Sequence, residues 1–256
     1  MSALLELRAV SKRYDNGTLA LKGVDLVIGE HEFVSLLGPS GCGKSTALRM
    51  IAGLSPVTSG KIAWPDLAAG SAADGRGISF VFQEPTLMPW TKVFDNVWLP
   101  LKLKGVARAA AQPQVDAVLA TVGLSQFANV YPRELSGGMK MRVSIARAMV
   151  TEPRLLLMDE PFAALDEMTR FKLNNDTLAL WHAKRFTTIF VTHSVYESVY
   201  LSNRIVVMAA RPGRVIADIA VDEPYPRSDS FRTTPHYAQW CVQVSQALQQ
   251  AGEHHG

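Results

Sequence analysis

The stretch Gly38-Pro39-Ser40-Gly41-Cys42-Gly43-Lys44-Ser45-Thr46 decides the fold class of this chain. An apolar run, Phe33 to Leu37, precedes it and a helical pattern from Lys44 to Ala52 follows, so the expected order is strand, loop and helix. Glycines let backbone N–H groups surround a phosphate, and the N-terminus of a helix adds the positive end of its dipole. Lys44 supplies a cation, and the hydroxyl of Ser45 is a ligand suited to Mg²⁺. A chance glycine-rich turn is the competing interpretation, and the flanking strand and helix argue against it.

The composition is that of a folded protein. Of 256 residues, 48% are hydrophobic and 19% are charged, and the length suits one α/β domain with a subdomain. The formal net charge is only +3, with lysines and arginines scattered along the chain, which argues against a nucleic-acid partner. The two cysteines, Cys42 and Cys241, have neither disulfide-framework nor metal-ligand spacing, so both are expected to be free thiols.

The sequence predicts no membrane span and no signal peptide. No apolar stretch approaches the ~20 residues that cross a bilayer. The N-terminus has no basic segment before its apolar residues, and Glu6 follows them at once. The expected compartment is therefore the cytosol.

The order of apolar runs predicts an α/β fold. Short runs broken by glycines from Leu4 to Leu37 indicate an antiparallel region that leads into a buried strand. Trp64 to Gly77 is typical of a surface loop, and the stretch between Trp90 and Val150 suits helices. Further strands are expected at Ile78–Phe82, Leu155–Met158, Thr187–Val191 and Ile205–Met208. Their alternation with helices predicts a parallel sheet.

Two carboxylates end one of these strands. Leu155-Leu-Leu-Met-Asp159-Glu160 is an apolar run whose polar end can reach the same edge of the sheet as the phosphate loop. Asp159 is suited to the Mg²⁺ shell, and Glu160 can orient or deprotonate a water molecule. Adjacent carboxylates after a strand are more often a surface turn, but the preceding phosphate loop favours the functional interpretation. A phosphate loop alone does not separate kinases, GTPases and transport ATPases.

Leu135-Ser136-Gly137-Gly138-Met139 resembles the signature sequence of ATP-binding-cassette (ABC) ATPases, and Arg142-Val-Ser-Ile-Ala-Arg147-Ala148 is similar to that family's next helix. The resemblance extends over about the first 215 residues. Further matches are Tyr14 at the position that stacks on adenine, Gln83 at the glutamine loop, Ala164-Leu165-Asp166 at the dimer-contact loop, and His193 at the switch histidine. There are departures: Met139 and Met141 replace signature glutamines, and Ser194 replaces the aspartate that often follows the histidine.

The resemblance implies a P-loop NTPase ABC fold with an antiparallel β region and a helical subdomain. It places the cassette at residues 1–220, with the subdomain at about 90–150, and leaves 221–256 as a C-terminal appendage with a candidate helix. Two cassettes would close head to tail, as a homodimer or with a similar cassette, so that Ser136, Gly137 and Gly138 of one copy meet the ATP on the other. Glu160 would be the general base and His193 would contact the γ-phosphate. Mg²⁺ would be held by Ser45, Asp159 and Gln83.

One importer branch is favoured. Gln83-Glu-Pro-Thr-Leu-Met-Pro-Trp90 and Pro161-Phe-Ala-Ala-Leu-Asp166 resemble the nitrate, sulfonate and taurine type of bacterial importer ATPase. This implies separate permease subunits, a solute-binding protein, and a peripheral location at the cytoplasmic face of the inner membrane. Alternatives are an export cassette, a cassette that works on DNA or ribosomes, and a degenerate cassette that only scaffolds a complex. The presence of Glu160 and His193 argues against the last.

The segment Leu87–Val97 is the expected docking surface for the permease, because it follows Gln83 and is rich in large apolar residues. For Val93 and Phe94, packing inside the helical subdomain is an equally good explanation. Trp90 is the sharper prediction, because a tryptophan beside a proline in a loop is a good interface anchor.

Overall fold

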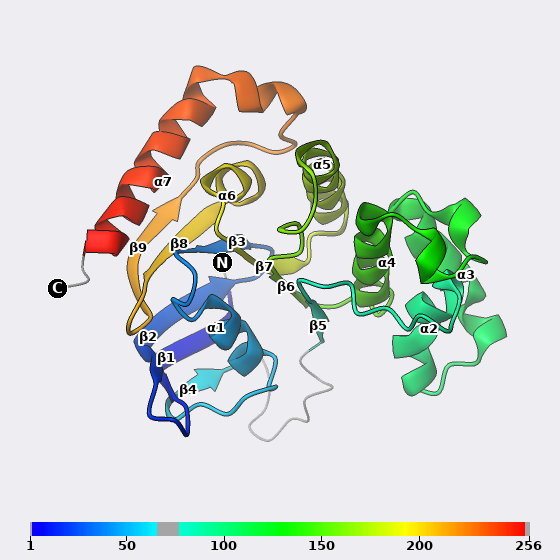
Figure 1. Ribbon diagram of the computed structural model, residues 1–256, viewed down its shortest axis with the longest axis horizontal. Coiled ribbons are helices and arrows are strands. Elements are labelled where there is room, and N and C mark those ends of the chain that lie inside the picture. Colours follow the sequence, from blue (N-terminus) through cyan, green and yellow to red (C-terminus); the bar gives the residue numbers. More distant parts are fainter. Residues whose placement is uncertain (1, 66–76, 254–256) are drawn as a thin grey trace.

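The computed structural model describes residues 2–65 and 77–253 (Figure 1). Most of the predicted loop from Trp64 to Gly77 therefore lies outside the described residues. None of the described helices combines the length and the apolar character that crossing a membrane requires. The predicted α/β architecture is confirmed.

The strands of the described residues form two sheets. A three-stranded antiparallel sheet has the order β2-β1-β4 and contains β1 (Ala3–Arg13), β2 (Leu19–Gly29) and β4 (Ser59–Ala63). A six-stranded sheet has the order β5-β6-β7-β3-β8-β9. Its members are β5 (Ile78–Val81), β6 (Leu155–Asp159), β7 (Thr187–Thr192), β3 (Phe33–Leu37), β8 (Arg204–Ala209) and β9 (Arg214–Ala220).

The predicted strands of the larger sheet are confirmed, and one is added. β5, β6, β7, β3 and β8 are parallel to one another, whereas β9 pairs with β8 in the antiparallel direction. The sequence did not indicate β9, because its residues are only half-buried and lack a clear apolar alternation.

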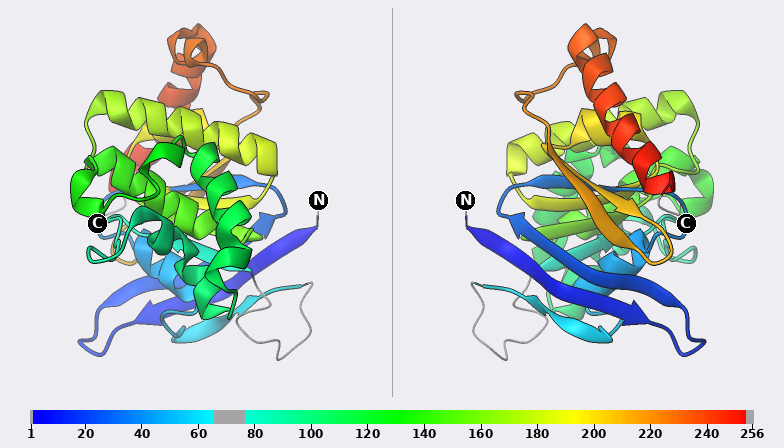
Figure 2. Two further views of the ribbon diagram at one scale, coloured as in Figure 1. Left: turned by 90° about the vertical axis from the view of Figure 1, so that its right-hand side faces the viewer. Right: turned by 90° about the vertical axis from the view of Figure 1, so that its left-hand side faces the viewer.

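The central strands are apolar throughout because both faces of the sheet are covered. Leu155 and Leu157 of β6 belong to the core on the side of the smaller sheet, and Leu156 and Met158 belong to the core on the opposite side. α1 (Lys44–Ile51) packs against β2, β6 and β7. Figure 2 shows the smaller sheet and the long C-terminal helix on opposite sides of the larger sheet.

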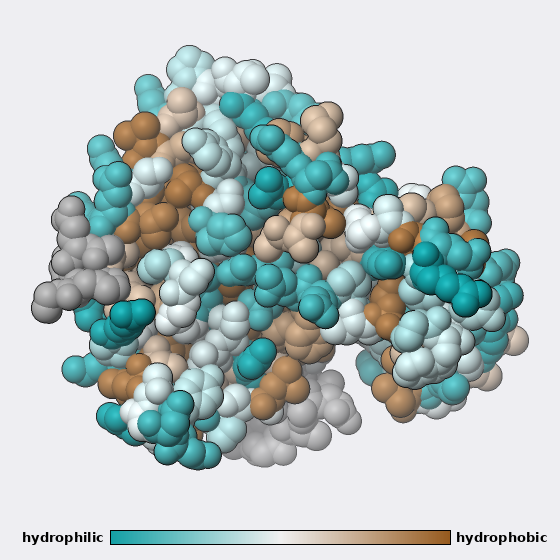
Figure 3. All heavy atoms as spheres, viewed as in Figure 1, coloured by the Kyte–Doolittle hydropathy of each residue, from teal (hydrophilic) through white to brown (hydrophobic). Residues whose placement is uncertain are grey.

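Three helices form a separate group beside the larger sheet (Figure 1): α2 (Val93–Leu103), α3 (Arg108–Thr121) and α4 (Gly137–Met149). Short 3₁₀ turns, η2 (Ser125–Phe127) and η3 (Pro132–Glu134), precede α4. Val93 and Phe94 are 0% and 2% exposed, so they pack in the core and cannot dock a partner. On the face shown in Figure 3, hydrophobic residues lie in small groups among hydrophilic ones.

The C-terminal segment packs on the rest of the chain. After α5 (Glu167–Lys184) and α6 (Val195–Leu201), the chain forms β8 and β9 and continues through η4 (Asp229–Thr233) into α7 (Pro235–Glu253). The guanidinium of Arg227, which is 6% exposed, donates hydrogen bonds to the carbonyl oxygens of Val199 (2.8 Å), Tyr200 (3.0 Å) and Ser202 (2.9 Å). The segment therefore covers the carbonyl groups at the end of α6.

Candidate nucleotide-binding site

The phosphate loop, Asp159, Glu160 and His193 meet at one edge of the larger sheet. Leu37 at the end of β3 is paired with Thr192 at the end of β7, and Asp159 at the end of β6 is paired with Val191. The carboxyl ends of three neighbouring parallel strands therefore present the phosphate loop, the two carboxylates and the histidine side by side. Such an edge is the usual ligand-binding edge of an open parallel sheet.

The phosphate loop needs its glycines for two different reasons. A Cβ on Gly38 would lie 2.5 Å from the carbonyl oxygen of Met208 and 2.8 Å from the sulfur of Cys42. Gly43 has φ +90°, and a Cβ there would lie 2.5 Å from Leu21. Gly41 also has positive φ, at +78°. A side chain would therefore collide with neighbouring atoms at Gly38 and Gly43, and it would strain the backbone at Gly41 and Gly43.

Cys42 fills the inside of this loop. Its side chain is buried, and burial raises the pKa of the thiol above its usual range. A protonated, enclosed thiol is a poor nucleophile. This geometry gives Cys42 a packing role, and both cysteines are free, as the sequence predicts.

Lys44 points back into the phosphate loop. Its ammonium group donates to the carbonyl oxygens of Gly38 (2.7 Å) and Pro39 (3.1 Å) and lies 3.9 Å from Oε1 of Glu160. The side chain is only 4% exposed. The ammonium group is held mostly by neutral carbonyl groups, so its positive charge is available inside the loop. An anionic phosphate oxygen can bind to it there.

Ser45 and Asp159 form a pair that suits a divalent cation. The Ser45 hydroxyl donates a 2.7 Å hydrogen bond to Oδ1 of Asp159, which is 9% exposed. Burial raises the pKa of Asp159, the hydrogen bond from Ser45 opposes that rise, and the charge of Glu160 adds to it. A buried carboxylate that lacks a full counter-charge, beside a hydroxyl oxygen, is the donor set that Mg²⁺ prefers.

Glu160 and His193 face each other across the ends of β6 and β7. Oε2 of Glu160 lies 3.4 Å from Nδ1 of His193. Glu160 has φ +46°, and its backbone N–H donates to the carbonyl oxygen of Val191 at 3.1 Å. A positive φ at a residue other than glycine is a strained conformation that the surrounding structure must impose. The turn therefore aims the carboxylate at the open edge of the sheet.

The turn that carries His193 is held by polar bonds that the sequence did not indicate. The Thr192 hydroxyl donates to the buried carboxylate of Glu197, and the N–H of Ser194 donates to the Thr192 oxygen at 3.0 Å. The Ser194 hydroxyl accepts from the N–H of Glu197 at 3.3 Å and caps α6. Serine and aspartate are both good N-cap residues. This explains why serine is tolerated at position 194, where the family often has aspartate.

Tyr14 and Gln83 also lie near this edge. The phenol of Tyr14, which is 39% exposed, is 3.1 Å from the Thr46 hydroxyl in the first turn of α1. Gln83 is exposed and follows β5 closely, where Val81 is paired with Met158. The phenol of Tyr14 thus lies beside the helix that follows the phosphate loop, and Gln83 follows a strand that neighbours β6.

Arg147 is a residue that the sequence analysis did not single out. From α4 it donates to the carbonyl oxygens of Thr86 and Pro85 at 2.9 Å, and to the Thr86 hydroxyl at 2.9 Å. Burial lowers its pKa. It therefore ties the signature helix to the segment that follows Gln83. The sequence indicates Arg147 only as part of the stretch that resembles the family's helix, and it does not indicate these bonds.

The signature residues lie away from the phosphate loop of the same chain. Ser136 caps α4 by accepting a 3.3 Å hydrogen bond from the N–H of Met139. A Cβ on Gly138 would lie 2.5 Å from Thr169, so this glycine allows α4 to approach α5, whereas a Cβ on Gly137 would lie 3.6 Å from Leu165. α4 packs on α2, α3, α5 and β5 rather than on α1. Met141 is 2% exposed and fills the helical core, which explains an apolar residue there.

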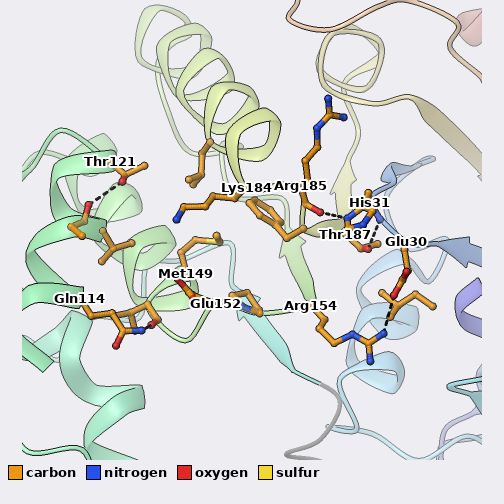
Figure 4. A pocket seen from close by; sticks show the side chains of 17 residues that line it. Glu30, His31, Gln114, Thr121, Met149, Glu152, Arg154, Lys184, Arg185 and Thr187 are labelled. Carbon is orange, nitrogen blue, oxygen red and sulfur yellow. Dashed lines mark hydrogen bonds and ion pairs between the residues drawn. The ribbon is translucent and has the colours of Figure 1, made fainter. Parts of the chain in front are cut away.

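A cavity of about 430 Å³ lies elsewhere (Figure 4). It is at the amino ends of β6 and β7, opposite the phosphate loop, and many of its polar groups bind one another. Arg154 donates to Glu30 at 3.0 Å, and the backbone N–H of His31 donates to the hydroxyl of Thr187 at 2.9 Å. None of the phosphate-loop residues, Gly38 to Thr46, lines this cavity.

Comparisons with known proteins agree with this geometry. A family model described as "ABC transporter" matches residues 21–163. The aliphatic sulfonates import ATP-binding protein SsuB of Bacillus licheniformis is 44% identical over 90% of this chain and 89% of its own length. The taurine import ATP-binding protein TauB of Rhizobium johnstonii is 45% identical over 82% of this chain and 79% of its own length. A solved dimeric ATP-binding cassette, in a post-hydrolysis state bound to ADP and Pi, is 33% identical with a TM-score of 0.75, covering 86% of this chain and 100% of that one. The chain therefore belongs to the ABC transporter family and is one of its ATP-binding, ATP-hydrolysing subunits.

Proposed function

We propose that this chain powers the import of a small sulfonate, taurine or a related solute such as nitrate through a separate permease. The similarity to sulfonate and taurine import proteins supports the solute class. The observation that supports the enzymatic role best is the convergence of the Lys44 cation, the Ser45–Asp159 pair and the Glu160–His193 pair at one sheet edge.

In the proposed reaction, Glu160 takes a proton from a water molecule as the water oxygen attacks the γ-phosphorus. The bond from that phosphorus to the β–γ bridging oxygen breaks, which gives ADP and phosphate. Lys44 offsets negative charge on the transferred group, and His193 contacts it from the opposite side. Tyr14 stacks on the adenine, and residues 38–46 surround the phosphates.

Ser45, Asp159 and Gln83 would hold Mg²⁺, which neutralises charge on the phosphate oxygens. The raised pKa of the Asp159 carboxyl supports this assignment, because a neighbouring cation would remove the cost of ionising it.

The proposed functional unit contains two cassettes, most simply two copies of this chain. Ser136 to Gly138 lie at the N-terminus of the 13-residue helix α4, where unpaired N–H groups attract an anion. Because the same chain's phosphate loop packs elsewhere, the ATP that meets this terminus would be bound to the other copy. A solved relative is dimeric, which supports the arrangement.

The proposed permease contact is the loop from Leu87 to Lys92. Asn96, which is fully buried, accepts from the N–H of Met88 at 2.8 Å and donates to the Met88 and Thr91 carbonyl oxygens at 3.1 and 3.2 Å. These bonds fix the loop, and Trp90 stands out of it with 73% of its surface exposed. A fixed loop with an exposed tryptophan is a good docking surface.

Membrane association in this proposal is peripheral, at the cytoplasmic face, through the permease, and a solute-binding protein completes the system. Purification of the chain from membranes with its permease, followed by uptake assays with taurine, an alkanesulfonate and nitrate, tests the proposal. ATP-dependent uptake of one of these solutes is the expected result. Uptake of none of them, by a complex that hydrolyses ATP, would refute the solute class.

A further inference from the structure

A second hollow, of about 330 Å³, lies between α5, α6 and the C-terminal segment. Its walls come from Glu167–Asn174 on α5, Ser194–Glu197 at the beginning of α6, and Arg232 and Tyr237 after β9. The hollow therefore exists only because the C-terminal segment covers α6. Its volume is roughly eleven times that of a water molecule in the liquid.

Two buried polar atoms at this hollow have no partner. Asn174 is 2% exposed, and its Oδ1 atom accepts no hydrogen bond. Arg232 uses Nη1 to donate to Asn175 (2.9 Å) and Asp229 (2.7 Å), and its guanidinium lies 3.4 Å from the centre of the Tyr200 ring, whereas its buried Nη2 donates no hydrogen bond within the described residues. Most buried polar groups in folded proteins are paired, so an unpaired acceptor and an unpaired donor in one hollow point to a missing ligand.

The charged groups at the hollow are of both signs. Within residues 2–65 and 77–253, the side chains of the half-buried Arg170 and of Glu167 make no hydrogen bond or ion pair, although burial raises the pKa of the nearby Glu197 carboxyl and the positive charge of Arg170 opposes that rise. Glu197 accepts from Thr192 with Oε2 only. Arg170 and Arg232 can therefore bind an anion, while Asn174 and Glu167 can accept from an ammonium group.

Aromatic rings complete the walls. Phe171 is 36% exposed and Tyr196 is 66% exposed, and both line the hollow. The Tyr237 hydroxyl donates to the carbonyl oxygen of Tyr196 at 2.9 Å, which fixes α7 against α6. Such rings can pack against the apolar part of a small ligand, and their faces attract a cation.

We propose that this hollow binds a small zwitterion, either an amino acid or an amino sulfonate. Its carboxylate or sulfonate lies against Arg170 and Arg232, and its ammonium group lies against Asn174, one turn of α5 beyond Arg170. The aromatic rings cover the carbon skeleton between the two charges. A hollow of this volume is at the small end of the range for ligand sites and suits a compound of amino-acid size.

The site adjoins the turn that carries His193. Ser194 follows His193 directly and lines the hollow, and Glu197 holds Thr192 on the other side of the histidine. An occupant therefore contacts the turn and changes the turnover of ATP. This goes beyond the proposed function, since it concerns a site that does not bind ATP.

Calorimetry on the full-length, nucleotide-free chain tests the proposal with taurine, L-phenylalanine and benzoate. Taurine or phenylalanine should bind, which also distinguishes an amino sulfonate from an amino acid. Benzoate, which lacks the ammonium group, should bind at least about tenfold more weakly. Binding of neither zwitterion at millimolar concentration overturns the proposal, and equal binding of benzoate overturns the zwitterion class.

Two variants locate the site. Arg170→Gln and Asn174→Leu should each weaken binding by at least about tenfold, because each removes one bond to a charged group. Lys172→Gln, at an exposed position on the same helix that does not line the hollow, should leave binding unchanged. Unchanged affinity in both pocket variants would mean that the ligand binds elsewhere.

Stability and turnover give two further readouts. Asn174→Leu should not lower the melting temperature, because it replaces an unpaired buried amide by an apolar group of similar size. The zwitterion should change kcat for ATP in the parent and in Lys172→Gln but not in Arg170→Gln. The binding measurements need no hydrolysis, so a chain that fails to hydrolyse ATP would contradict the proposed function and leave this proposal standing.

Discussion

Nδ1 of His193 lies 3.4 Å from Oε2 of Glu160, and the ammonium group of Lys44 lies 3.9 Å from the other oxygen of the same carboxylate. The Glu160 carboxylate therefore lies between two groups suited to the γ-phosphate. In the proposed reaction, this position would put the general base beside the attacking water.

Glu160→Gln should keep ATP binding and lose turnover by about 10²- to 10⁴-fold, the usual contribution of a general base. The amide preserves the shape of the side chain but does not accept the proton. Single-turnover hydrolysis within the assembled transporter measures the loss, and size-exclusion chromatography with ATP should show a more stable dimer. Glu152→Gln, at an exposed carboxylate on the opposite edge, is the control. Parental turnover in Glu160→Gln would refute the assignment.

Lys44→Ala should weaken ATP binding by at least about tenfold and reduce hydrolysis with it. The variant removes the ammonium group inside the phosphate loop and keeps the backbone N–H groups. Equilibrium dialysis with labelled ATP measures the affinity, and Lys61→Ala, at an exposed lysine on β4, controls for the loss of one positive charge. If both variants bind ATP as tightly as the parent, Lys44 does not contact the phosphates.

Asp159→Asn should stabilise the nucleotide-free chain and abolish Mg²⁺-dependent hydrolysis. Burial raises the pKa of the folded carboxyl, so the folded state binds a proton more tightly than the unfolded state. The free energy of unfolding therefore falls as the pH rises from the unfolded pKa through the folded one, and the folded state carries the cost of an ionised group above that window. Asparagine removes this cost and still accepts the hydrogen bond from Ser45.

Thermal unfolding of the parent and Asp159→Asn between pH 4 and pH 8 measures the effect. A gain of about 0.5–2 kcal/mol at neutral pH is typical of one stabilising change. The difference should shrink toward acidic pH, where the parent carboxyl is protonated. A variant that is less stable than the parent at pH 7 would mean that ionised Asp159 is well compensated in the absence of a cation.

The fold was largely predictable because its strongest signals are local. Phe33–Leu37 and Leu155–Met158 form continuous apolar runs because helices or a second sheet cover both faces of these strands, and few other structures need such runs. β9 escaped prediction because a half-buried edge strand carries little apolar periodicity. The start of α7 lacked an apolar pattern that would separate it from η4.

The site was predictable where one segment carries both the motif and its function. The glycines at positions 41 and 43 are an example, since each has a positive φ that its own backbone requires, whereas Gly38 is required in part by Met208 on a distant strand. Arg147 and Glu197 were missed, because their partners, Thr86 and Thr192, can be identified only once distant segments are packed together or a turn is formed. Hydrogen bonds between segments leave no periodicity or spacing in the sequence.

Arg227→Met should destabilise the chain by about 2–4 kcal/mol. The methionine cannot donate to the carbonyl oxygens at the end of α6, and buried acceptors without partners are costly. Denaturant unfolding measures the loss, with Arg133→Met at an exposed arginine as the control. A loss no larger than that of the control would show that the C-terminal segment is held by its apolar contacts alone.

Trp90→Ala should leave folding and ATP binding intact and weaken permease association by at least about thirtyfold, the loss expected of an interface anchor. Its side chain is 73% exposed, so its removal leaves no cavity, and the surrounding loop is fixed by Asn96 rather than by the indole. Leu103→Ala, at a 79% exposed position at the end of α2, removes a similar apolar group outside this loop and should have no effect. Co-purification with the permease and transport-coupled hydrolysis measure the outcome. A Trp90→Ala chain that assembles and transports like the parent would exclude the indole as an anchor, and the permease would then contact another surface of the helical group.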